Sequence, residues 1–122
     1  MKNILLVEDD SFLIDIYTTK IKESGFSVEV ASEGEEAVRR VKEEKFDLVL
    51  LDIVLPRVDG WEILKQIKAE SKLKDLKVII ISNLSQKEEV ERGMNLGAEK
   101  YLIKAHYTPS EVVKEMKEVL GE

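Results

Sequence analysis

The chain has 122 residues, of which 43% are hydrophobic and 36% are charged, and this predicts a single globular domain, residues 1–122, with its own core. The formal net charge of −6 disfavours direct binding to nucleic-acid phosphates. The chain has no cysteine, which excludes thiol chemistry, and no apolar run that suits a signal peptide or membrane span, so we expect a cytoplasmic protein without membrane contacts.

Short apolar runs alternate with stretches of helical periodicity. In chain order they predict a strand at 4–7, a helix over 13–21, a strand at 28–30, a helix over 37–41, a strand at 48–51, a helix over 63–67, a strand at 78–81, a helix over 86–96, a strand at 101–103 and a helix over 112–120. Three of the runs are continuous and rich in Val, Ile and Leu, as in strands covered on both faces. This alternation predicts a parallel sheet with right-handed crossovers.

Local signals refine these boundaries. Gly93 interrupts the pattern over 86–96 and weakens that helix. Pro109 suits the first turn of the last helix. We interpret Asp59-Gly60 as a turn, and the lysine-rich connection over 72–77 as a solvated loop.

Polar side chains follow four of the five expected strands. Glu8 and Asp9 follow the first strand, Asp52 the third, Ser82 the fourth and Lys104 the fifth. In an open parallel sheet, ligands bind beyond the carboxyl ends of the strands, where the strand order reverses. If the order is 2-1-3-4-5, these five side chains gather at one rim.

The five side chains have a shared chemistry. Carboxylates that meet at one point repel one another and need a cation, and oxygen ligands suit Mg²⁺ rather than the zinc that Cys and His clusters bind. Asp52 would then attack phosphorus and form an aspartyl phosphate. Ser82 and Lys104 would contact the phosphoryl oxygens. Taken singly, Asp9, Ser82 and Lys104 each have a structural alternative, such as a helix cap or a surface lysine. Asp52 is harder to explain in this way, because an acid directly after four apolar residues is costly unless it is compensated. Their joint placement carries the prediction.

These residues resemble the response-regulator receiver family over nearly the whole chain. The segment 51–60, LDIVLPRVDG, is similar to the family's phospho-acceptor segment, and residues 6–10 are similar to its acidic pair. Residues 81–82 and 97–104 match two later signatures in order and spacing. The resemblance implies an α/β fold of the flavodoxin or CheY-like type, with a doubly wound five-stranded parallel sheet, order 2-1-3-4-5, and helices on both faces.

The resemblance also implies a metal-dependent signalling switch rather than an enzyme that turns over an external substrate. Asp52 would accept a phosphoryl group from a histidine kinase or a histidine phosphotransfer protein, and self-dephosphorylation would remove it. Mg²⁺, with Mn²⁺ as an alternative, would bind Asp9, Asp52 and the backbone carbonyl of Val54 directly, and Glu8 mostly through water.

The switch and the output surface are implied in the same way. Ser82 would move toward the phosphoryl group, and Tyr101 would swing inward as Ser82 moves, while Lys104 contacts the phosphoryl oxygens. The fourth helix, fifth strand and fifth helix would bind a downstream effector protein. The chain would be a monomer or a weak, phosphorylation-dependent dimer.

Three departures from the family pattern affect the site. Ala105 follows Lys104 where the family usually has proline, so we expect a trans peptide bond and a reshaped loop there. Asn83 replaces a usually small residue and would crowd the phosphoryl pocket. Val54 and Leu84 are apolar near the path of attacking water, which predicts slow self-dephosphorylation.

Three alternative functions stay open. A receiver-like module that acts without phosphorylation draws support from Ala105 and Asn83. A phosphatase of the haloacid dehalogenase type would need a second Asp at position 54, where this chain has Val54. A nucleotide or flavin binder of the flavodoxin type would need a glycine-rich phosphate loop, whereas the first strand leads into acidic residues 8–10.

Overall fold

The computed structural model describes all residues from 1 to 122. In chain order its elements are β1 (Asn3–Val7), α1 (Ser11–Glu23), β2 (Ser27–Ala31), α2 (Gly34–Glu43), β3 (Leu48–Asp52), α3 (Gly60–Ala69), β4 (Lys77–Ser82), α4 (Lys87–Asn95), β5 (Lys100–Ile103), the short 3-10 helix η1 (Lys104–His106) and α5 (Pro109–Leu120). Each predicted strand and helix is present, with ends that differ by one to a few residues. None of the helices combines the length and apolar composition that a bilayer crossing requires.

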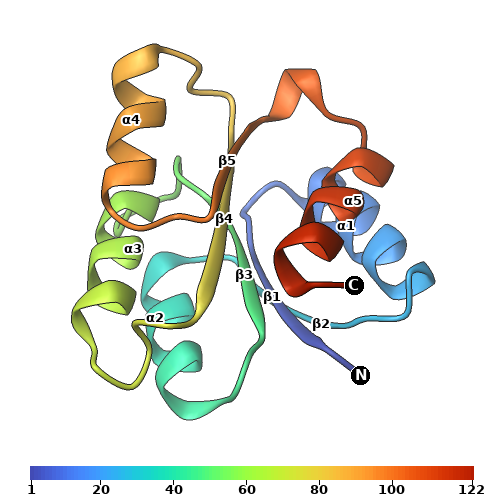
Figure 1. Ribbon diagram of the computed structural model, residues 1–122, viewed down its shortest axis with the longest axis horizontal. Helices are drawn as coiled ribbons and strands as arrows, with labels where there is room; N and C mark the ends of the chain where they lie inside the picture. The colour runs from blue at the N-terminus through green and yellow to red at the C-terminus, as the bar shows by residue number, and fades with distance from the viewer.

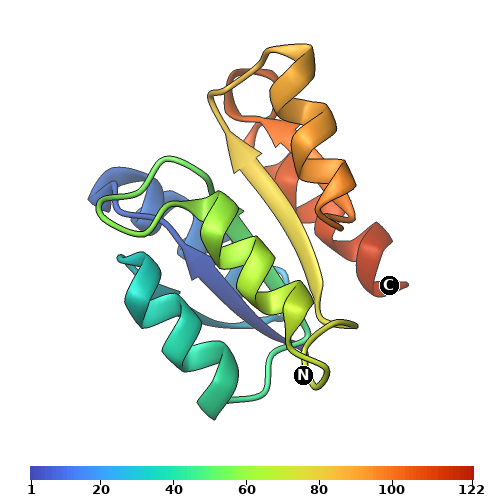
Figure 2. The same cartoon turned by 90° about the vertical axis from the view of Figure 1, so that its left-hand side faces the viewer.

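The five strands form one parallel sheet in the order β2-β1-β3-β4-β5, as predicted. Helices α2, α3 and α4 cover one face of the sheet, and α1 and α5 cover the other (Figures 1 and 2). The weakly apolar strand β2 lies at one edge and the short β5 at the other. The strand order reverses between β1 and β3, so the carboxyl ends of these two strands border a crevice.

Alternate side chains of each central strand enter two separate cores. Toward α2 and α3 the cluster includes Leu5, Val49 and Ile80, and toward α1 and α5 it includes Leu6 and Leu50. Because both faces are covered, residues 4–7 and 48–51 are fully buried without the polar alternation of a one-sided sheet. Each such aliphatic side chain contributes about 1.5–3 kcal/mol through burial, which makes the sheet a rigid support for the strand ends.

Side-chain caps begin the two helices that flank the crevice. The Asp10 carboxylate accepts hydrogen bonds from the Phe12 and Leu13 amides, at 2.9 and 3.2 Å, and starts α1. Asp59 accepts from the Glu62 amide at 3.1 Å and starts α3, with Gly60 as the first helical residue. The interpretation of Asp59-Gly60 as a turn therefore needs correction, because the carboxylate caps a helix that begins at Gly60.

The helix predicted over 86–96 is present as α4 and continues through Gly93. Glycine is required at this position because a side chain would collide with Ile80 of the sheet. One boundary differs from the prediction. Lys77 is the first residue of β4 rather than part of the loop, since it pairs with Leu48 in the sheet. The rest of the lysine-rich connection is a series of turns, as expected.

Candidate functional site

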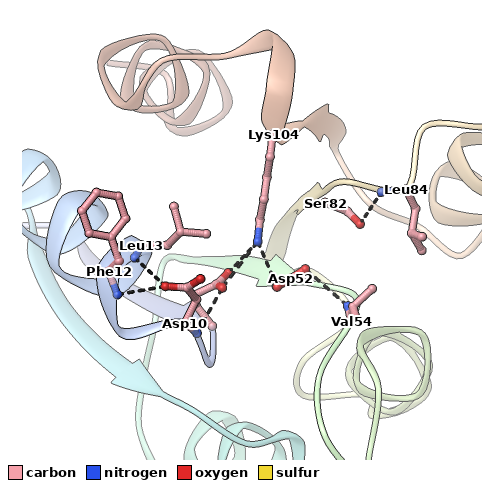
Figure 3. Close-up of polar contacts among 9 residues, drawn as sticks. Asp10, Phe12, Leu13, Asp52, Val54, Ser82, Leu84 and Lys104 are labelled. Atoms are coloured by element: carbon pink, nitrogen blue, oxygen red, sulfur yellow. Dashed lines mark hydrogen bonds and ion pairs between the residues drawn. The ribbon is translucent and has the colours of Figure 1, made fainter.

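A pocket of about 380 Å³ opens at the carboxyl ends of β1, β3 and β5. Figure 3 shows Lys104 reaching down into it toward Asp52, with Asp10 and Leu13 on one side and Val54 on the other. Its lining residues are Glu8, Asp9, Asp10, Leu13, Asp52, Val54, Asn83 and Lys104. The prediction that residues from separate strands meet at one rim is thus confirmed for the acids and the lysine.

Three carboxylates form the centre of the pocket. Glu8, Asp9 and Asp52 each present an oxygen within 4.8 Å of the other two. Glu8 and Asp52 are buried, at 1% and 4% exposure, whereas Asp9 is exposed. An all-oxygen ligand set that is partly buried and partly open to water suits Mg²⁺, which keeps several waters when it binds carboxylates. These three residues therefore fit a divalent metal ion.

Lys104 is the one cation bonded to the two buried carboxylates. Its Nζ lies 3.0 Å from Asp52 Oδ2 and 3.0 Å from Glu8 Oε2. Burial opposes the charged amine, but the carboxylates of Asp52 and Glu8 outweigh it and raise the pKa of Lys104. The lysine is therefore positively charged at neutral pH. One positive charge does not balance the three carboxylates of the pocket, and a second cation would offset the negative charge that remains.

Glu8 has the most perturbed acidity in the pocket. Burial, and then the negative charge of Asp52, raise its pKa to about 7, against the opposing effect of Lys104. The Glu8 carboxylate also accepts a hydrogen bond from the Asp10 amide at 3.3 Å. Glu8 therefore exchanges a proton near neutral pH, in a position where a metal ion would compete for the same oxygen atoms.

Ser82 lies at the end of the neighbouring strand but points elsewhere. It is fully buried, and its Oγ accepts a hydrogen bond from the Leu84 amide at 3.1 Å (Figure 3). Strand alternation explains this orientation, because Ser82 continues the face of Ile80, whereas Asp52 continues the opposite face of Leu50. The structure thus brings Ser82 near the rim without including it among the residues that line the pocket.

Tyr101 contacts the same loop. Its ring is half-buried against the core, and its hydroxyl donates a hydrogen bond to the Leu84 carbonyl at 2.7 Å. The backbone of Leu84 therefore connects the two candidate switch residues: its amide bonds to Ser82 and its carbonyl to Tyr101. The Tyr101 ring is thus turned toward the β4–α4 loop while Ser82 still accepts from the Leu84 amide, so this position of the ring does not require the movement of Ser82 that we expected to accompany it.

The departures from the family pattern have clear structural outcomes. No peptide bond is cis, so the predicted trans bond between Lys104 and Ala105 is confirmed, and the loop after β5 forms η1. The Val54 amide donates to Asp52 Oδ1 at 3.3 Å, while the Val54 side chain is 59% exposed. Sequence reasoning missed Leu13 as a lining residue; its position three residues after the Asp10 cap was the available signal.

Comparisons with known proteins agree with this geometry. Residues 4–117 match the family model described as response regulator receiver domain. The chain is 35% identical, over 98% of its length, to the alkaline phosphatase synthesis transcriptional regulatory protein PhoP of Bacillus subtilis, and spans 48% of that protein. A receiver domain protein of Methanospirillum hungatei superposes with a TM-score of 0.90 at 30% identity, covering 99% of this chain and 94% of that one.

A further solved structure shares the fold. The receiver domain of sensor histidine kinase PA1611 from Pseudomonas aeruginosa superposes with a TM-score of 0.89 at 24% identity, over 99% of this chain and 98% of that one. Its active site cleft holds a coordinated magnesium ion. At this level of identity the similarity concerns the fold alone.

Proposed function

The chain belongs to the response regulator receiver domain family of two-component systems, and from that premise we propose that it is a phospho-accepting switch. Asp52 receives a phosphoryl group from a histidine kinase or a histidine phosphotransfer protein, in the presence of Mg²⁺ or Mn²⁺. The observation that carries the proposal is the buried Asp52 carboxylate, which lies 3.0 Å from the Lys104 amine and beside two further acids at the mouth of a pocket.

The positions of these groups support the proposed transfer. A carboxylate oxygen of Asp52 forms a bond to phosphorus, while the bond from phosphorus to the donor's imidazole nitrogen breaks and the imidazole leaves. The Val54 amide, which donates to Asp52 Oδ1, orients the carboxylate for attack. Lys104 exchanges its contact with Asp52 for one with a phosphoryl oxygen, so positive charge is present where negative charge develops.

Glu8, Asp9 and Asp52 would hold the metal ion, with the backbone carbonyl of Val54 as a proposed further ligand. When bound, the ion would offset the carboxylate charge and orient the phosphoryl oxygens. Asp9 is the accessible member of the set and would bind directly. Glu8 is already bonded to Lys104, and this contact supports binding mainly through water.

Switching would use the two hydrogen bonds of Leu84. If the Ser82 hydroxyl rotates to donate to a phosphoryl oxygen, the Leu84 amide loses its acceptor. The carbonyl of the same residue holds the Tyr101 hydroxyl, so a shift of the loop changes the position of the Tyr101 ring as well. The movement would reach α4, β5 and α5, which we propose as the surface for a downstream effector.

We propose that residues 1–122 act as a single domain. The net charge of −6 supports a protein effector rather than direct contact with nucleic acid. We propose a monomer, or a weak dimer that forms on phosphorylation. The chain acts as a signalling switch whose chemistry is limited to accepting and losing its own phosphoryl group.

Intact-mass measurement of acetyl phosphate labelling in Mg²⁺ tests the proposal. The wild type should gain one phosphoryl group, the Asp52→Asn variant should gain none, and an Asp75→Asn control in an exposed turn should match the wild type. Undiminished labelling of Asp52→Asn would refute the assignment. A wild type that neither labels nor binds beryllofluoride would favour the phosphorylation-independent module instead.

A further inference from the structure

Helix α4 is the helix that the core holds least. Its one buried residue is Gly93, whereas each of the other α-helices buries at least two residues. A Cβ on Gly93 would lie 2.6 Å from Ile80 Cδ1 and 2.9 Å from Tyr101 Cδ2, so the helix approaches the sheet closely at Gly93. A segment with few buried apolar contacts moves at a low free-energy cost.

A second contact attaches α4 to its neighbour. The guanidinium carbon of Arg92 lies 4.4 Å from the ring centroid of Trp61, within the range of a cation–π interaction. Trp61 belongs to α3 and is 7% exposed, packed in the core between the sheet and the helices. The ring is therefore a fixed partner, while Arg92 belongs to the helix that buries the fewest residues.

Trp61 is in turn tied to the end of β3. The preceding residue, Gly60, donates its amide to the Ile53 carbonyl at 2.8 Å. A Cβ on Gly60 would lie 2.6 Å from the Asp52 carbonyl oxygen and 2.6 Å from Ile53 Cα. The backbone beside Trp61 thus touches the backbone of the candidate phospho-acceptor. This contact fixes the position of the Trp61 ring relative to the pocket.

We propose that the stack of Arg92 on Trp61 is a latch that holds α4 in its unphosphorylated position and opens when α4 moves. The inference rests on the proposed function. The stack coexists with the Ser82–Leu84 hydrogen bond and the Lys104–Asp52 ion pair, both of which phosphorylation would break. The stack connects α4 to α3 directly, and it does not involve the hydrogen bonds of Leu84.

Linkage sets the sign and size of the effect. A contact that stabilises the unphosphorylated arrangement shifts the equilibrium between the two arrangements of α4. Binding of a phosphoryl analogue, which needs the other arrangement, becomes weaker by the same factor. A cation–π contact at an exposed site corresponds to a factor of about two to five. Loss of the arginine should therefore tighten the binding of beryllofluoride, although it removes a positive charge from a protein that binds an anion.

Calorimetric titration with beryllofluoride at saturating Mg²⁺ tests the latch. Arg92→Ala should bind about two- to fivefold more tightly than wild type, and Arg92→Lys, which keeps a cation, should lie between them. Arg39→Ala, an exposed arginine on α2, is the matched control for charge and should equal wild type. Trp61 is the sole tryptophan, so its emission should change on binding in wild type and much less in Arg92→Ala.

The outcomes separate the latch from the proposed function. Equal affinities for Arg92→Ala and Arg39→Ala would overturn the latch while the wild-type titration still supports the phospho-acceptor. A wild type that binds no beryllofluoride would overturn the proposed function, and the latch with it. Both variants alter an exposed side chain, and their thermal melts should confirm that they are folded.

Discussion

Magnesium and a proton should compete for Glu8. Burial, and then the charge of Asp52, raise the pKa of Glu8 from 4.5 to about 7. Because the charge of a bound Mg²⁺ favours the ionised carboxylate, whether Glu8 contacts the ion directly or through water, binding of Mg²⁺ should displace this proton. With a pKa of about 7, the ionised fraction is about 0.9 at pH 8 and about 0.1 at pH 6. The dissociation constant for Mg²⁺ should therefore be about tenfold larger at pH 6 than at pH 8.

Calorimetric titration of MgCl₂ at pH 6, 7 and 8 measures this dependence. Repeating each titration in two buffers of different ionisation enthalpy counts the protons released, which should approach one at pH 6 and almost none at pH 8. Glu8→Gln should bind Mg²⁺ more weakly but with little pH dependence. A wild-type affinity that changes by less than about twofold across this range, or an equal slope in Glu8→Gln, would refute the reasoning.

The same pKa links pH to the stability of the metal-free protein. The folded chain binds this proton more tightly than the unfolded chain does, so the contribution of Glu8 to stability is fully present below pH 4.5. That contribution is lost as the pH rises through about 7. In Glu8→Gln this loss should be absent. Chemical denaturation measures it as the change in the free energy of unfolding between pH 5 and pH 8, which should be smaller in the variant than in the wild type.

Other substitutions test further parts of the structure. Lys104→Met leaves two buried carboxylates without their cation, and should lower the free energy of unfolding at pH 8 by about 3 kcal/mol in urea titrations without metal; no measurable loss would contradict the ion-pair geometry. Gly34→Ala places a Cβ 2.2 Å from the Val58 carbonyl oxygen and should cost about 1–3 kcal/mol, seen as a lower melting temperature. Val54→Asn with Leu84→Glu should admit and orient water and speed phosphoryl decay by about tenfold; equal decay rates would remove the explanation for a long lifetime.

Much of the fold could be predicted because its physical signals are local. The continuous apolar runs at 4–7 and 48–51 indicated strands covered on both faces, and the alternating run at 28–30 indicated the edge. The carboxyl ends of the parallel strands of one sheet share one rim, so the meeting of Asp52 and Lys104 followed once the strand order was assumed.

The parts that could not be predicted depend on three-dimensional orientation. The Ser82 hydroxyl turns toward Leu84, because the register of β4 on β3 pairs Asp52 with Ile81 and so puts Ser82 on the opposite face. The proton on Glu8 depends on a degree of burial that no sequence pattern measures. The stack of Arg92 on Trp61 joins two helices whose relative position is set by packing on the sheet, so spacing along the chain gives no signal of it.

Peptide mapping by tandem mass spectrometry, after treatment of the wild type with acetyl phosphate and Mg²⁺, locates the phosphoryl group. We expect a single phosphoryl group on Asp52, which hydroxylamine removes as it does any acyl phosphate. A modification carried by another residue, or one that resists hydroxylamine, would contradict the claim that the carboxylate at the end of β3 is the acceptor.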